Sequence, residues 1–220
     1  MHRHHYDMSI TAMQPDYLND LLTAGSAPLG PAIGSIETGH RVGQVIRQLL
    51  SKKNGFYAFE SALLVRPLTF SGAPLGLLEW NDLGYWKQFY TIDLSEDIFF
   101  AEDVFGEQFS LRPDGIFKFN PETAISEFFS DDIRGWAGKI MEDYSLHTGY
   151  QLAHLWQLKY GQLAAGYRLV PKMPFVLGGE YQIENLTLRS DLQGIEFRSQ
   201  IANQIVDLPD GAQVEFKLIE

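Results

Sequence analysis

The stretch FFAEDVFGEQFSLRPDGIFKFNPET, residues 99–123, carries the clearest structural pattern in the chain. Pro113-Asp114-Gly115 is typical of a tight turn, because proline presets φ at an early turn position and glycine accepts a positive φ. The residues after the turn alternate, so the side chains of Phe117 and Phe119 are expected on one face of a strand and Lys118 on the other. The stretch therefore predicts an antiparallel hairpin with a turn at Asp114-Gly115, in which four phenylalanines are mostly buried: Phe105, Phe109, Phe117 and Phe119.

Patterns outside the hairpin predict further elements. Apolar residues at helical spacing indicate helices, and short alternating or continuous apolar runs indicate strands. The predicted helices cover residues 11–22, 42–50, a segment starting near Asn81 or Asp82, 131–144, 148–160 and 192–208. The predicted strands outside the hairpin cover residues 63–65, 180–186 and 214–218. No repeat or linker interrupts the chain, so residues 1–220 are expected to form one α+β domain, with a mainly antiparallel sheet and helices packed against it.

One predicted helix has a clear start. Ser130 or Asp131 is expected to cap its N-terminus, where carboxylates also meet the positive end of the helix dipole. Ile133 and Trp136 continue at helical spacing into Ile140 and Tyr144, which predicts one buried stripe.

Composition excludes several classes of protein. The 220 residues include no cysteine, so there is no disulfide framework, thiol nucleophile or thiolate metal site. No apolar run is long enough to span a membrane, and the first residues lack the apolar core of a secretory signal. Acidic residues number 28 against 17 basic ones, giving a net charge of −11. Such a surface repels nucleic acid and anionic lipid but attracts a basic partner, and we expect a cytoplasmic protein.

Four acidic doublets are the main candidates for chemistry. They are Glu96-Asp97, Glu102-Asp103, Asp131-Asp132 and Glu142-Asp143. Adjacent residues point in different directions on a strand or helix, so a doublet does not make a catalytic pair. Sequence motifs for phosphate binding, calcium binding or a nucleophilic serine are absent. We therefore expect no catalytic residue, no metal site and no cofactor, and favour an acidic surface that binds a partner.

A dense aromatic segment, which includes Trp80 and Trp86, allows a different interpretation. Such rings could stack on bases or sugars. Their neighbours Glu79 and Asp82 are acidic, and no basic track accompanies them, which argues against nucleic acid. We favour core packing, and keep a carboxylate-based hydrolase near these rings as the alternative function.

Several segments together resemble one known family. They are Asn54-Gly55-Phe56 with AFESALLVRP (58–67), LLEWN (77–81), EDVFGEQFSLRPDGIFKFNPET (102–123), RLVPKMPFVLGGEYQIENL (168–186) and IANQIVDLPDGAQVEF (201–216). They resemble the SUKH superfamily, the bacterial relatives of a fungal cell-wall-synthesis regulator. The resemblance covers most of the chain after about residue 53, and residues 1–52 match least well.

The resemblance implies an α+β fold and a role in immunity. Many bacterial members are similar to proteins that neutralise polymorphic toxins, often nucleases, delivered between competing cells. The family supplies no catalytic residues to transfer. We therefore expect a protein that binds a cognate toxin with a basic surface, with a regulatory scaffold as a further alternative. The expected partner-binding residues are Glu96, Asp97, Glu102, Asp103, Asp131 and Asp132.

Overall fold

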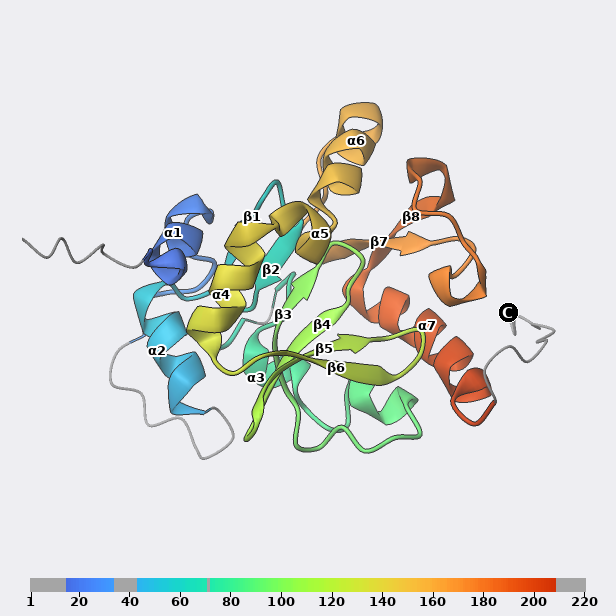
Figure 1. Ribbon diagram of the computed structural model, residues 1–220, viewed down its shortest axis with the longest axis horizontal. Coiled ribbons are helices and arrows are strands. Elements are labelled where there is room, and N and C mark those ends of the chain that lie inside the picture. Colours follow the sequence, from blue (N-terminus) through green and yellow to red (C-terminus); the bar gives the residue numbers. More distant parts are fainter. Residues whose placement is uncertain (1–14, 34–42, 71, 209–220) are drawn as a thin grey trace, which may run out of the picture.

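The computed structural model describes residues 15–33, 43–70 and 72–208, and confirms the predicted α+β class (Figure 1). Its main sheet has six strands in the order β1-β2-β3-β4-β5-β6, each antiparallel to the next, and β7 and β8 form a separate antiparallel pair. The strands are β1 (Phe56–Ala58), β2 (Leu63–Val65), β3 (Ile98–Asp103), β4 (Gln108–Arg112), β5 (Gly115–Asn120), β6 (Ile125–Ser130), β7 (Tyr167–Pro171) and β8 (Leu186–Ser190). The α-helices are α1 (Tyr17–Ala24), α2 (Gln44–Lys52), α3 (Leu77–Trp80), α4 (Ile133–Glu142), α5 (Tyr144–Thr148), α6 (Tyr150–Tyr160) and α7 (Asp191–Ile205), and the 3₁₀ helices are η1 (Trp86–Phe89), η2 (Phe175–Leu177) and η3 (Ile183–Asn185).

The predicted hairpin is β4 and β5. Arg112 pairs with Gly115, so Pro113 and Asp114 form the turn, one residue earlier than predicted, and Gly115 takes a φ of +141°. The burial of Phe105, Phe109 and Phe119 is confirmed. Phe117 is only partly buried, because it lies next to β6, the edge strand of the sheet. Its ring meets the exposed ring of Phe128 on that strand edge-on at 5.6 Å.

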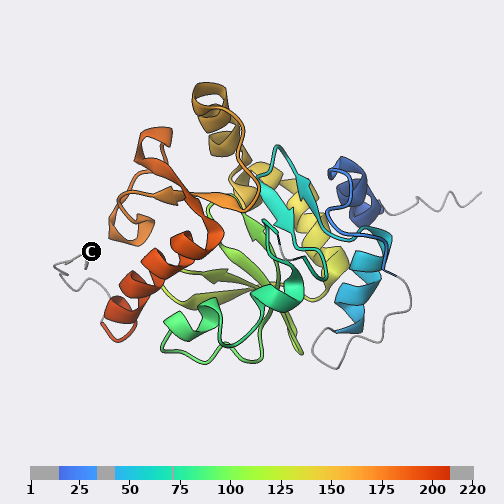
Figure 2. The same ribbon diagram turned by 180° about the vertical axis from the view of Figure 1, so that it is seen from behind.

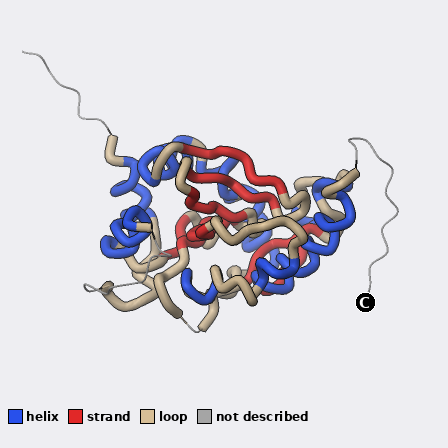
Figure 3. The backbone as a smooth tube through the Cα atoms, turned by 90° about the horizontal axis from the view of Figure 1, so that it is seen from below, coloured by secondary structure: helices blue, strands red, loops and turns tan. Residues whose placement is uncertain are grey.

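Helices α1, α2 and α4 cover one face of the sheet. Leu21, Ile46 and Trp136 bring apolar side chains from these three helices into one core. The rings of Phe100 and Phe109 meet Trp136 edge-on at 5.1 and 5.8 Å. Figure 3 shows the strands lying between the α1–α2 end of the molecule and α7.

The opposite face of the sheet packs against α7, α3 and η1, as Figure 2 shows from behind. Trp80 and Trp86 are fully buried there, beside the rings of Phe99 and Phe119. Ile195 brings α7 into the same core. The preference for core packing of the aromatic segment is therefore confirmed.

Three details of the predicted elements are wrong. No helix starts at Asn81 or Asp82. Asn81 follows the end of α3, and its side-chain amide donates to the Phe99 carbonyl while its side-chain oxygen accepts from the Phe99 N–H, both at 2.8 Å. Residues 180–185 are not a strand: Asn185 donates to the carbonyls of Met173 and Glu180, and the strand begins only at Leu186.

The third difference concerns the residue that caps α4 and the residues that form its buried stripe. Asp132 caps this helix, since its carboxylate accepts a hydrogen bond from Gly135 N at 2.8 Å. Asp143 ends α4 and caps α5, so Tyr144 leaves the buried stripe. The predicted strand at 214–218 and the first residues of the predicted helix at 11–22 lie outside the described residues.

Candidate functional site

The doublet Glu102-Asp103 is buried, and its two carboxylates point to opposite faces of β3. Glu102 faces the α7 side, where Arg66 Nη2 lies 2.9 Å and Arg168 Nε 2.7 Å from its oxygens. Gln108, its partner across the strands, donates a third hydrogen bond at 2.6 Å. Burial alone raises the pKa of the Glu102 carboxyl, but the two guanidinium groups and Gln108 outweigh it and hold the pKa below its usual value.

Asp103 is held on the other side of the strand. Lys118 Nζ lies 3.0 Å from one carboxylate oxygen. The other oxygen accepts hydrogen bonds from the backbone N–H groups of Phe105 and Glu107, both at 2.9 Å. This carboxylate fixes the β3–β4 turn and is 1% exposed, so it presents nothing to a partner.

The predicted acidic binding face is therefore wrong in part. Asp97, Glu102 and Asp103 are buried because each one neutralises a basic side chain; Asp97 binds Arg112 at 2.6 Å. Glu96, Asp131 and Asp132 are exposed and remain candidates for partner contact. Of these, Asp132 already serves as the cap of α4.

The turn between β1 and β2 is unusual in its backbone. Phe59, Glu60 and Ser61 have φ values of 52°, 52° and 69°, the left-handed region that non-glycine residues rarely occupy. Such residues persist where surrounding contacts hold them, and they gather at functional sites. Here α5 and α6 supply the contacts: the ring of Phe59 stacks on Tyr144 at 4.5 Å, and Gln157 donates to the Glu60 carbonyl at 2.9 Å.

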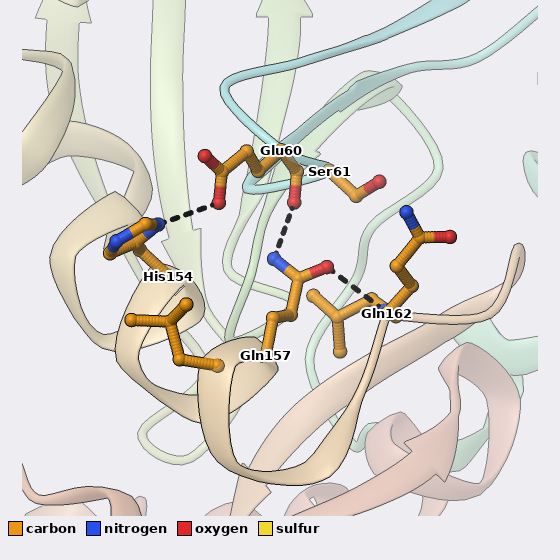
Figure 4. Close-up of a pocket in the computed structure, with 7 residues that line it drawn as sticks. Glu60, Ser61, His154, Gln157 and Gln162 are labelled. Carbon is orange, nitrogen blue, oxygen red and sulfur yellow. Dashed lines mark hydrogen bonds and ion pairs between the residues drawn. The ribbon is translucent and has the colours of Figure 1, made fainter.

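Between this turn and α6 lies a surface pocket of about 400 Å³, which we call the Glu60 pocket (Figure 4). It is lined by Glu60, Ser61, His154, Gln157, Leu158, Gln162 and Leu163. The Glu60 carboxylate lies 2.8 Å from Nδ1 of His154 and accepts a hydrogen bond from the Tyr150 hydroxyl at 3.3 Å.

A carboxylate that orients an imidazole occurs in hydrolytic triads and behind metal-binding histidines. The Glu60 pocket lacks the remaining parts. Figure 4 shows the Ser61 hydroxyl pointing away from His154, so it is not placed as a nucleophile. Within the described parts of the chain, no group of three His, Cys, Asp or Glu side chains could hold a metal ion. Sequence reasoning missed this pair because 94 residues separate Glu60 from His154 and no motif connects them.

Helix α6 projects from the body of the molecule (Figure 1), and several of its apolar side chains are exposed. Ala153 and Trp156 face inward and are buried. Three apolar residues face solvent, and we call them the α6 crest: Leu155 is 44%, Leu158 72% and Tyr160 53% exposed. Leu155 and Leu158 are three residues apart and so lie next to each other on the helix surface.

Comparisons with known proteins identify a similar fold. No protein-family model matches the chain, and no curated protein matches it by sequence. The crystal structure of Atu4351 from Agrobacterium tumefaciens is similar, with a TM-score of 0.50 over 81% of this chain and 86% of that chain. The two sequences are 13% identical, so the likeness concerns the fold alone. Within the described residues, no helix has the length and apolar character needed to cross a membrane.

Proposed function

We propose that this chain is an immunity protein, which binds a cognate polymorphic toxin in the cytoplasm and neutralises it without chemistry of its own. The observation that carries the proposal is the α6 crest. Two neighbouring leucines and a tyrosine are exposed on this projecting helix, and a contiguous apolar patch on a surface is typical of a protein–protein interaction site. The resemblance of the sequence to the SUKH superfamily supports the same role.

The negative net charge of the chain supports the proposal that its partner has a basic surface. A nuclease toxin holds nucleic-acid phosphate with lysine and arginine side chains. A chain with a net charge of −11 attracts such a surface and speeds the encounter. Glu96, Asp131 and Asp132 are the exposed carboxylates that remain from the predicted acidic face, and we propose that Glu96 and Asp131, which cap no helix, steer association rather than supply most of the affinity.

The decisive experiment is a test of neutralisation. Each candidate toxin gene found next to the gene for this chain is expressed in a susceptible bacterium, with or without the chain, and survival is counted. The proposal predicts that the chain restores growth and forms a complex of defined stoichiometry with the purified toxin domain. Growth arrest that persists despite equal expression of the folded chain would reject it.

The Glu60–His154 pair favours one alternative, a hydrolase in which the imidazole acts as a base on an activated water. The alternative predicts substrate turnover that His154→Ala abolishes. The immunity proposal instead predicts that His154→Ala neutralises the toxin as the wild type does. One variant therefore separates the two functions.

A further inference from the structure

A second cleft, which we call the Phe105 cleft, lies where α5 and the start of α6 meet the β3–β4 turn. Its volume is about 460 Å³, within the range of ligand-binding pockets. The buried ring of Phe105 and the half-buried Leu152 line it. Leu146 and Tyr181 also line it and are 70% and 62% exposed, so apolar surface continues from the cleft to the outside.

The walls of this cleft are held in place. Tyr181 stacks on Phe175 with ring centroids 3.9 Å apart, and Phe105 meets the Phe175 ring edge-on at 5.4 Å. Gly149 has a φ of +69°, and a Cβ there would lie 2.4 Å from the Phe105 ring, so only glycine fits. The cleft is therefore formed before any partner arrives, which lowers the entropy cost of binding.

The surroundings of the cleft are acidic. Asp143 lines it and is exposed, and the neighbouring Glu142 is exposed as well. At the Tyr181 side, desolvation and then the nearby Glu107 and Glu122 raise the pKa of the tyrosine.

Within the described part of the chain, no cation forms an ion pair with Glu142 or Asp143, whereas Glu107 is balanced by Lys118. Lys118 is already paired with Asp103 at 3.0 Å and Glu107 at 2.6 Å. Lys139 donates to the Phe129 carbonyl at 2.6 Å. Negative charge around an apolar hollow is complementary to an apolar side chain carried by a basic segment.

We infer that the Phe105 cleft receives one large apolar side chain of the toxin, flanked in the toxin sequence by lysine or arginine. This inference rests on the proposed function and adds where the toxin docks and what it presents there. An aromatic side chain is the best occupant, since it buries roughly 150–250 Å² and packs edge-on against rings such as Phe105 and Tyr181.

The chemistry of the cleft is tested without the toxin, by titrating the ¹⁵N-labelled chain with the peptide acetyl-Lys-Lys-Trp-Lys-Lys-amide. We expect saturable shifts of the amide signals of Leu146, Gly149, Leu152 and Tyr181. The charge-reversed peptide acetyl-Glu-Glu-Trp-Glu-Glu-amide should bind at least about tenfold more weakly. Shifts confined to another surface, equal binding of both peptides, or no saturable shift up to about 5 mM peptide would each overturn the inference.

Two variants and a control sharpen the peptide experiment. Leu146→Ser should weaken binding of the lysine peptide about tenfold, because it removes an apolar wall of the cleft without adding a charge. Glu142→Gln/Asp143→Asn should weaken it about threefold and reduce its salt dependence; asparagine still caps α5 in place of Asp143. Leu83→Ser, at an exposed leucine between α3 and η1, should bind as the wild type does.

A second arm uses the toxin itself and separates the two proposals. Leu146→Ser should bind the toxin at least about tenfold more weakly than Leu83→Ser does. Equal affinity would overturn the inference and leave the proposed function standing. A toxin that the wild-type chain fails to bind would reject the proposed function, while the peptide arm would still decide the chemistry of the cleft.

Discussion

The Glu102 network, by which we mean Glu102 with Arg66, Arg168 and Gln108, buries charged and polar side chains, whereas the α6 crest exposes apolar ones. Inside the molecule, fully buried Glu102 holds the equally buried guanidinium groups of Arg66 and Arg168. Outside, Leu155 and Leu158 extend into solvent. The comparison separates two uses of residue chemistry: Asp97, Glu102 and Asp103, three of the six charges that sequence analysis assigned to partner binding, pair with basic side chains inside the fold, whereas leucines of a predicted helix lie at the surface.

The network fixes elements that lie far apart in the sequence. Arg66 follows β2, Arg168 belongs to β7, and both converge on one carboxylate of β3. Arg66 also lies 3.6 Å above the Trp80 ring and binds Asp191 at the start of α7 at 3.3 Å. A buried ion cluster of this kind contributes little net stability but is costly to break on one side.

The largest effect is therefore expected from Glu102→Ala. The variant leaves the buried guanidinium group of Arg168 without a carboxylate and Arg66 with Asp191 alone, and should lower the free energy of unfolding by about 3–5 kcal/mol in urea denaturation. Glu96→Ala, at an exposed carboxylate, is the control and should change stability by less than about 0.5 kcal/mol. Similar values for the two variants would show that the network does not hold the elements together.

The next effect compares two phenylalanines on one face of β5. Phe119→Ala removes a fully buried ring and should cost about 3–5 kcal/mol. Phe117→Ala removes a partly exposed ring that packs on Arg112 and Phe128, and should cost about 1–2 kcal/mol. A larger loss for Phe117→Ala would contradict the observed burial on this strand.

A smaller effect tests the role of the exposed doublet Asp131-Asp132. Asp132→Ala removes the cap of α4 and should lower stability by about 1 kcal/mol. Asp131→Ala should lower it by less than about 0.5 kcal/mol, because this side chain makes no cap. Thermal unfolding of both variants at one pH provides the measurement, and equal losses would remove Asp132 from its capping role.

The smallest stability effect is expected at the α6 crest. Leu155→Asp/Leu158→Asp should change the free energy of unfolding by less than about 1 kcal/mol, because Leu158 is 72% exposed and Leu155 44% exposed. A loss of several kcal/mol would mean that these leucines belong to the core, and the contrast with the Glu102 network would disappear.

Local patterns predicted much of this fold. Turn chemistry and alternation located β4 and β5, and helical spacing located α4, α6 and α7. The alternation rule also indicated that Glu102 and Asp103 point apart. Their burial depends on Arg66, Arg168 and Lys118, whose positions are set by tertiary contacts that a local pattern does not contain.

The candidate site depended still more on distant contacts. Glu60 meets His154 only because α6 packs beside the β1–β2 turn. Helical spacing predicted an apolar helix at α6 but did not separate the buried Trp156 from the exposed Leu155 and Leu158, because α6 carries apolar residues on all of its faces. Which of these apolar residues are exposed depends on the elements that pack against α6, and the local sequence does not contain that information.

The central claim is that the α6 crest binds the toxin, and one measurement tests it most directly: the affinity of the purified toxin domain for Leu155→Asp/Leu158→Asp. The matched control is Ile125→Asp, at an exposed residue of β6 that is 57% exposed. We predict that the double variant keeps its fold and binds the toxin at least about a hundredfold more weakly, while the control binds as the wild type does. An affinity of the double variant within about twofold of the wild type would contradict the claim.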